Sequence, residues 1–337
     1  MNRSSPGLSH RDTSLSISKS IDGFLKFKTA EGLSLRTISS YEYTLNHWLN
    51  YISDRSVSEI QASDLTGYLA WLRTEYKPVR FNGSTEPLSA KSIRNVWITF
   101  RSFFGWLHVE FKYPNPAIEI PAPKFQIHPV EAFTKEDVEK IMKACVYSRE
   151  SQTEQRKKFV MHRPSANRDQ AIVLTLLDSG LRATELCSLT INDVDLKTGK
   201  VTIQHGVIGG AKGGKGRTVY LGKVTRKAVW RYLAGREDGE DSQAPLFISQ
   251  ADRPFNKDSL RVLINRLGAR AEVKKTYPHK FRHTFAITYL RSGGDIFTLQ
   301  SLLGHGSLDM VRHYAQIADV DVEQAHRKAS PADNWRL

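Results

Sequence analysis

The segment YPHKFRHTFAITYL, residues 277–290, contains residue types that could bind and activate a phosphate group. Pro278 suits the first turn of a helix, so the sequence predicts a helix on which His279 and Arg282 share one face. Arginine offers a fixed positive fork for non-bridging phosphate oxygens, and histidine donates or accepts a proton near neutral pH. Because H-x-x-R is a common pattern, its function has to be argued together with other residues.

A second cation lies in SGLRATELCSL, residues 179–189, where Arg182 follows Gly180. Gly180 is expected to end a buried helix, and Arg182 to precede the start of the next one. An arginine within this apolar run is costly unless it has an anionic partner. That partner is either a bound anion or Glu185, three residues further on, in a surface salt bridge.

Two more segments carry candidate groups. In AKGGKGR, residues 211–217, glycines allow close approach to a ligand, and Lys212 and Lys215 are expected to project from a turn. A solvated hairpin tip without a ligand would explain this pattern equally well. The pattern is not that of a phosphate-binding P-loop. In LLGHGSLDMVRHYAQI, His305 lies between glycines and precedes Tyr314 by nine residues. A tyrosine at helical spacing commonly packs in a core, but beside cations it can act as a nucleophile toward phosphorus.

The order of these residues is more informative than any one of them. Through SGLRATEL, GGAKGGKGR, HKFRHTFA and LLGHGSLDMVRHYAQI, the sequence resembles the tyrosine recombinase, or phage-type integrase, family in its two-domain, Xer-like form. The resemblance covers residues 15–320. The catalytic set that it implies is Arg182, Lys212, His279, Arg282, His305 and Tyr314.

The resemblance implies an enzyme that cuts and rejoins DNA at specific sites. Tyr314 would attack the scissile phosphate and form a 3′-phosphotyrosyl bond, while Arg182 and Arg282 clamp the non-bridging oxygens. Lys212 would protonate the leaving 5′-oxygen, and His279 would assist proton transfer at the tyrosine.

The same resemblance assigns supporting roles. His305 would hydrogen-bond the phosphate, Glu185 would orient Arg182, and His283, in the family's usual R-H pair, would be structural. Lys215 and Arg217 are expected to contact DNA only. No metal or other cofactor is implied, because a ring of cationic groups stabilises the transition state. No ATP is implied either, since the covalent intermediate conserves the energy of the cleaved bond.

Double-stranded DNA recombination sites are the expected partner, bound by a homotetramer that holds two duplexes. The sequence departs from the family pattern at Met310 and Val311, where a small polar pair is usual. Residues 149–167 read as a polar surface loop inserted relative to compact members. The tail 319–337 contains VDVEQAHRKA, a candidate short helix that would pack into a neighbouring protomer.

Two other functions remain open. A type IB topoisomerase shares this chemistry, and a DNA-binding accessory factor could keep the fold without cleavage. Within the recombinase interpretation, integration, transposition, excision and dimer or plasmid resolution all use the same architecture, and a simple core-site or mobile-element enzyme fits best.

Composition agrees with a nucleic-acid partner. The 337 residues have a formal net charge of +14, of which +3 falls in residues 1–123 and +11 in residues 124–337. Such an imbalance is typical of proteins that bind a polyanion. Two cysteines, Cys145 and Cys187, are too few for a disulfide framework. No apolar run is long enough for a membrane span, and the N-terminal residues lack a secretion signal, so we expect a cytoplasmic protein.

The elements expected to position these residues are mostly helical. Apolar residues at steps of three and four predict helices at about 15–29, 36–52, after an N-cap at Ser63, and 89–109. Further on, Thr134 and Asp137 form a capping-box pattern, and a buried helix is expected at 168–178. Alternating runs around the glycine-rich turn predict a small antiparallel sheet of three strands within residues 193–221.

The sequence therefore predicts a mainly α fold with a small antiparallel β-sheet, divided into a helical, SAM-like core-binding domain and a catalytic domain. Five proline residues in YPNPAIEIPAPKFQIHP indicate a linker between them. The expected divisions are a disordered tail 1–12, a core-binding domain 13–113, a linker 114–130, a catalytic domain 131–318 and the tail 319–337. Basic residues expected to face DNA are Lys91, Arg94, Arg101, Arg261, Arg266 and Arg270.

Overall fold

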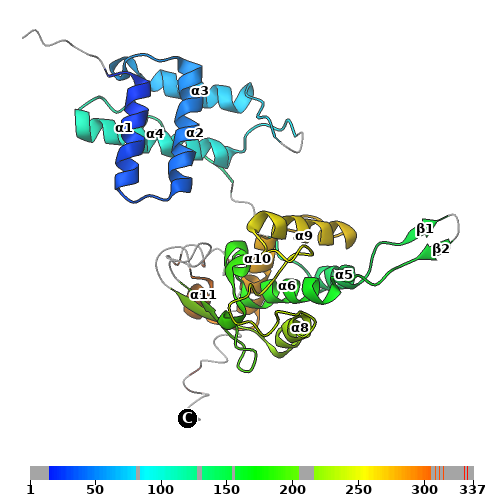
Figure 1. The fold of residues 1–337 in the computed structure, drawn as a ribbon. Helices are drawn as coiled ribbons and strands as arrows, with labels where there is room; N and C mark the ends of the chain where they lie inside the picture. The colour runs from blue at the N-terminus through cyan, green and yellow to red at the C-terminus, as the bar shows by residue number, and fades with distance from the viewer. Residues whose placement is uncertain are drawn as a thin grey trace, which may run out of the picture. The chain divides into compact units, whose positions relative to one another are not determined.

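The structure is a computed structural model that describes residues 15–80, 84–126, 131–153, 156–204, 216–304 and, beyond these, residues 308, 311, 314, 330 and 332. The chain divides into two compact units, residues 1–128 and 129–337 (Figure 1). The expected disordered tail 1–12 lies outside the described residues.

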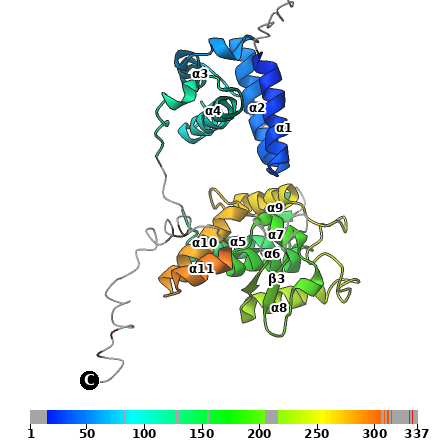
Figure 2. The same ribbon diagram turned by 90° about the vertical axis from the view of Figure 1, so that its left-hand side faces the viewer.

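The described residues of the N-terminal unit form four α-helices, as the spacing of its apolar residues predicts (Figure 2). Serine side chains cap three of them by accepting a backbone N–H from the first turn, namely Ser16, Ser34 and the predicted Ser89. The predicted cap at Ser63 is wrong, because the helix begins two residues earlier, where Gln61 is the N-cap and forms a capping box with Asp64. The helices are α1 (Ile17–Ala30), α2 (Leu35–Ile52), α3 (Ala62–Thr74) and α4 (Ala90–Phe111), with a short 3-10 turn η1 at Val57–Glu59.

Aromatic side chains fill the core between these helices. Trp48 of α2 is fully buried and meets the rings of Phe100 and Phe104 of α4 edge-on, with centroids 5.2 and 5.8 Å apart. Phe24 of α1 makes the same kind of contact with Phe103 at 5.5 Å. Edge-to-face packing of large rings stabilises a small helical unit beyond the area that they bury.

The proline-rich segment expected as a linker packs on α4 over part of its length. The 3-10 turn η2 (Pro116–Ile118) has Ala117 fully buried. The indole N–H of Trp97 donates to the carbonyl of Ile120 at 3.0 Å. These residues belong to the N-terminal unit.

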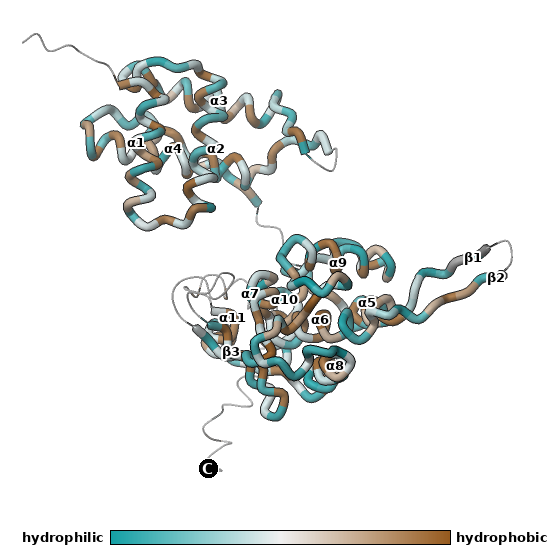
Figure 3. The backbone as a smooth tube through the Cα atoms, in the orientation of Figure 1, coloured by the Kyte–Doolittle hydropathy of each residue, from teal (hydrophilic) through white to brown (hydrophobic). Residues whose placement is uncertain are grey.

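The second unit is built around α6 (Ala166–Ser179), which contacts α5, α8 and α10. Apolar residues recur on α6 and α10 in Figure 3, and Ile172, Val173 and Leu176 of α6 are fully buried. The predicted Thr134–Asp137 capping box starts α5. The remaining helices are α5 (Lys135–Val146), α7 (Ala183–Ser188), α8 (Lys223–Leu233), α9 (Lys257–Arg270), α10 (Pro278–Arg291) and α11 (Ile296–Leu303), with a 3-10 turn η3 at Ile191–Asp193.

The small sheet has fewer strands than expected. In the described part of the chain, β3 (Lys200–Ile203) pairs antiparallel with β4 (Arg217–Tyr220), with Val201 opposite Val219. The expected third strand is reduced to a single bridge between Val194 and Val201. The pairing stops there because the 3-10 turn Ile191–Asp193 precedes Val194, and a tight turn follows it, in which the N–H of Gly199 donates to the carbonyl of Asp195 at 2.7 Å.

A ribbon of two strands replaces the surface loop expected within 149–167, so that prediction is wrong. Strands β1 (Ser151–Thr153) and β2 (Arg156–Phe159) pair antiparallel, and Figure 1 shows them projecting from the body beside α5. At the base of the ribbon, backbone hydrogen bonds join Ser148 to Met161 and Arg163 to Val146, both at 2.8 Å. The ribbon was not predictable from the sequence because its residues show no alternation of apolar and polar side chains.

None of the helices in the described ranges is both long and apolar enough to cross a bilayer.

Candidate active site

The end of α6 brings the first arginine into position. Gly180 adopts a left-handed conformation with φ of 63° and ends α6 as predicted, and Arg182 then becomes the N-cap of α7. A Cβ atom on Gly180 would lie 2.4 Å from the ring of Phe285. Glycine is therefore required both by the backbone conformation and by the close approach of α10.

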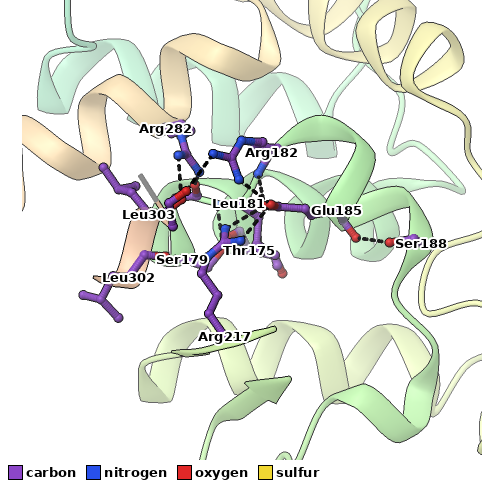
Figure 4. A network of polar contacts seen from close by, with 12 residues as sticks. Thr175, Ser179, Leu181, Arg182, Glu185, Ser188, Arg217, Arg282, Leu302 and Leu303 are labelled. Carbon is purple, nitrogen blue, oxygen red and sulfur yellow. Dashed lines mark hydrogen bonds and ion pairs between the residues drawn. The ribbon is translucent and has the colours of Figure 1, made fainter. Parts of the chain in front are cut away.

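Arg282 is buried on α10 and held by two helix ends (Figure 4). Its side chain is 1% exposed and donates to the carbonyls of Gly180 and Leu303, both at 2.8 Å. These carbonyls belong to the C-terminal ends of α6 and α11, where the helix dipole favours a cation. Burial, and then the charge of Arg182, lowers the pKa of Arg282 to about 9, so the guanidinium stays charged at neutral pH.

Glu185 lies between two further arginines, as Figure 4 shows. Arg182 donates to it from its backbone N–H at 2.8 Å and from its guanidinium at 2.7 Å. Arg217, from the start of β4, makes a two-point contact with both carboxylate oxygens, each at 2.7 Å. Burial by itself would raise the pKa of Glu185, but hydrogen bonds and charge from Arg217, followed by Arg182, lower it to about 2.

The four charged groups leave a net positive charge. Three guanidinium groups, of Arg182, Arg217 and Arg282, face one carboxylate of Glu185 in the interior of the unit. Arg182 is the most accessible of the four, with 24% of its side chain exposed. A cluster with two uncompensated positive charges in a low-dielectric setting favours a bound anion. Arginine forks match the oxygens of a phosphate.

The candidate nucleophile lies next to this cluster. The hydroxyl of Tyr314, a residue that is 4% exposed, is 2.7 Å from Nδ1 of His283. Burial raises the pKa of Tyr314, while Arg282 and then Arg182 act to lower it. Both arginines therefore stabilise the oxygen once it loses its proton.

His279 lies in the first turn of α10. Its side chain is exposed at one side. Partial burial of the imidazole, followed by the positive charges of Arg282 and Arg182, lowers its pKa. Its ring lies 5.0 Å from that of His283, one helical turn further along α10. The contact with the Tyr314 hydroxyl that the structure records is made by His283.

The structure brings together Arg182, Glu185, His279, Arg282, His283 and Tyr314 of the predicted set. Lys212, Lys215 and His305 lie outside the described residues. The sequence groups Arg217 with Lys215 as a DNA contact, whereas the structure places its guanidinium on Glu185. Within the described ranges, no group of three or more His, Cys, Asp and Glu side chains is arranged to hold a metal ion.

The basic residues expected to face DNA divide into two sets. Lys91, Arg261 and Arg266 are exposed. The others make contacts within the protein, since Arg94 donates to Pro123 at 3.2 Å and Arg270 donates to Ala144 at 2.9 Å. Arg101 lies over the ring of Trp97, 5.6 Å from its centroid. DNA contact by all six stays a prediction.

The sequence did not predict two contacts of this site, that of Arg217 with Glu185 and that of His283 with Tyr314. For the contact of Arg217 with Glu185, one feature of the sequence was informative. Glu185 lies in an apolar run, where a buried carboxylate needs more than one cation. The second contact had no signal, because a histidine next to an arginine on a helix does not reveal what it faces.

Comparison with known proteins identifies the two units. Residues 131–320 match the phage integrase family, and residues 21–110 match the N-terminal SAM-like domain of phage integrases. This chain belongs to the phage integrase family. As a member it is a site-specific recombinase, an enzyme that cleaves and rejoins DNA.

Similar proteins include the tyrosine recombinase XerA of Thermococcus kodakarensis, which is 30% identical over 314 residues that cover 92% of this chain and 94% of the relative. The tyrosine recombinase XerD of Listeria innocua is 27% identical over 324 residues, covering 92% of this chain and 98% of that protein. The sequence similarity therefore extends along nearly the full length of this chain and of each relative.

Solved structures share the fold. The Tn1549 transposon integrase in complex with circular intermediate DNA superposes with a TM-score of 0.67 at 17% identity, covering 89% of this chain and 94% of that one. XerH site-specific recombinase bound to its difH substrate gives 0.60 at 20% identity, covering 94% and 84%.

Proposed function

We propose that Tyr314 is the nucleophile of this recombinase and attacks a DNA phosphate to form a 3′-phosphotyrosyl bond, releasing a 5′-hydroxyl. Arg182 and Arg282 hold the non-bridging oxygens, and Lys212 gives a proton to the leaving 5′-oxygen. His279 and His305 complete the set at the phosphate. The observation that carries the proposal is a buried tyrosine hydroxyl beside a guanidinium cluster with a net positive charge.

This chemistry needs neither a nucleotide nor a metal cofactor in the proposed mechanism. The phosphotyrosyl bond conserves the energy of the cleaved phosphodiester. The same site can therefore catalyse both cleavage and the reverse reaction, which rejoins the strand. Preorganised cations supply the stabilisation of the developing charge, which in other phosphoryl-transfer enzymes comes partly from metal ions.

The test is a trapping assay on DNA. Nicked duplexes tiled across the sequence that flanks the gene would be offered to the protein, and a denaturant-resistant protein–DNA adduct sought. The adduct should form with the unchanged protein and with Tyr147→Phe, an exposed tyrosine at the end of α5 that serves as the control. It should vanish with Tyr314→Phe, which keeps its DNA binding.

Binding of these duplexes without any adduct would instead favour the non-cleaving accessory factor. A type IB topoisomerase would relax supercoiled DNA without joining two duplexes. Strand transfer between two labelled duplexes separates it from a recombinase, and the names of the relatives favour the recombinase.

The active assembly that we propose is a homotetramer on two duplexes, with the segment 319–337 of one protomer packed on the next. An apolar groove of about 910 Å³ on the catalytic unit supports this arrangement. Among its lining residues are Val138, Leu177, Phe285 and Tyr289. Deleting residues 319–337 should abolish cooperative assembly while leaving the binding of one protomer to DNA. Unchanged assembly would contradict the proposal.

The proposed setting is the cytoplasm, in keeping with two cysteines that are both free, Cys145 and Cys187. We further propose that the chain acts on simple core sites, as a mobile-element or resolution enzyme, through contacts that include Lys91, Arg261 and Arg266. Strand-exchange assays on the trapped site, in its integrative and excisive arrangements, distinguish these roles.

A further inference from the structure

His283 lies one helical turn after His279 on α10, directly behind the arginine that enters the phosphate site. Its Nδ1 atom is 2.7 Å from the hydroxyl oxygen of Tyr314, and the two ring centroids are 5.6 Å apart. A structural role alone would not require a basic nitrogen at the reacting atom.

We propose that His283 takes the proton of the Tyr314 hydroxyl as that oxygen attacks phosphorus. The proposal rests on the function proposed above and moves a role that the sequence assigned to His279. In the cleavage step, the O–H bond of Tyr314 breaks and its proton passes to His283 Nδ1 while the oxygen–phosphorus bond forms. The bond to the 5′-oxygen breaks, and that oxygen receives a proton from Lys212. Rejoining runs the same transfers in reverse.

The hydrogen bond along which the proton would move is already formed in the structure without DNA. A distance of 2.7 Å is normal for a hydroxyl that donates to a ring nitrogen, and it needs no rearrangement for the proton to move. The helix holds His283 rigidly, because Arg282 next to it is fixed by two backbone carbonyls. Within the described ranges, the charges that lower the pKa of Tyr314 are those of Arg282 and Arg182, and both favour the tyrosinate that the transfer creates.

His279 is left free for the phosphate side of the site. It lies near Arg282 and Arg182. Burial is the main cause that lowers the pKa of His279, and the charges of these two arginines are the next. Residues four apart on a helix share a face, so both histidines border the same site. His283 contacts the nucleophile there, and His279 is available to the phosphate.

The contact itself can be tested without DNA. If His283 accepts from Tyr314, its neutral ring carries hydrogen on Nε2, and ¹⁵N NMR of the imidazole should show an unprotonated, hydrogen-bonded Nδ1. Tyr314→Phe should shift that nitrogen signal and leave exposed His162 unchanged. A proton found on Nδ1 in the DNA-free protein would overturn the proposal.

The chemical step is tested with His283→Asn in the trapping assay. Asparagine keeps a hydrogen-bonding group near the place of Nδ1 but cannot take a proton, so adduct formation should slow by about 100-fold or more. DNA binding and melting temperature should match those of the unchanged protein, as should the activity of the control His162→Asn. An adduct rate near that of the unchanged protein, or a faster one, would overturn the proposal.

Two further measurements cover the case in which His283→Asn is poorly folded. With His283→Ala, imidazole in the buffer should restore part of the rate, since it supplies the missing acceptor. On a substrate with sulfur in place of the leaving 5′-oxygen, Lys212→Ala should recover, because a thiolate leaves without a proton, while the His283 variants should stay slow. Recovery of the His283 variants on this substrate, or no effect of imidazole, would contradict the role.

These outcomes are distinct from failure of the proposed function. If the unchanged protein forms no adduct, the recombinase mechanism itself fails. If it forms one that depends on Tyr314 but not on His283, only the present inference fails.

Discussion

Arg217 and Glu185 form a two-point ion pair in the interior of the catalytic unit, with both nitrogen–oxygen distances at 2.7 Å. The third guanidinium nitrogen of Arg217 donates to the carbonyl of Leu302 at 2.7 Å. One side chain thus joins the start of β4, the carboxylate on α7 and the end of α11. Lys212 precedes β4 by five residues in the sequence. The ion pair therefore holds in place the first residue of the strand that follows the lysine.

Replacing Arg217 by methionine should destabilise the catalytic unit. Removing one partner of a buried pair leaves a charge without full compensation, and Arg182 would remain as the single cation on Glu185. We expect the free energy of unfolding to fall by about 3 kcal/mol, measured by urea denaturation. Arg231→Met, an exposed arginine on α8, is the control, with a change within about 0.5 kcal/mol. Equal effects of the two substitutions would show that the pair contributes nothing.

Acid should weaken the protein through Glu185. Its pKa in the folded state is about 2, below the value of 4.5 for an unperturbed carboxyl. The stabilisation is therefore present above pH 4.5 and lost as the pH falls from 4.5 toward 2. In urea titrations at pH 7, 5, 4 and 3, the stability difference between the unchanged protein and Glu185→Gln should narrow over the acidic range. A difference that stays constant with pH would contradict this assignment.

Local patterns in the sequence predicted much of the frame of the site. Ser89 caps α4, Thr134 and Asp137 form the capping box of α5, and Pro278 starts α10. Each signal works within one helical turn, where the side chain satisfies backbone groups that the helix leaves unpaired. The end of α6 at Gly180 was predictable for the same reason, since only glycine adopts its conformation without strain.

Contacts between distant segments could not be predicted in this way. Arg217 and Glu185 are separated by 32 residues, and His283 and Tyr314 by 31. The resemblance supplied the motif residues as expectations, yet no local pattern shows which histidine contacts the tyrosine. The β1–β2 ribbon was missed because its strands are paired through main-chain groups and have no apolar face to bury.

Gly180→Ala should be strongly destabilising. The added Cβ would lie 2.4 Å from Phe285 and would have to occupy a left-handed backbone conformation. We expect a loss of about 2 kcal/mol or more in the free energy of unfolding. The control is Gly67→Ala in α3, where no atom lies within 4 Å of the added Cβ. There the free energy of unfolding should rise by roughly 0.5–1 kcal/mol. If both variants lose stability equally, the packing of α10 on the end of α6 is not what requires glycine.

Arg282→Lys tests whether the site needs a guanidinium fork or only a positive charge. A lysine ammonium cannot hold the carbonyls of Gly180 and Leu303 in the same plane while it also faces a phosphate. Adduct formation in the trapping assay should therefore fall by about 100-fold to 1000-fold, while DNA binding changes little because the charge is kept. Arg291→Lys, exposed at the end of the same helix, should behave like the unchanged protein. An Arg282→Lys variant with full activity would mean that positive charge alone stabilises the transition state, and that the two backbone contacts of Arg282 serve the fold and not the chemistry.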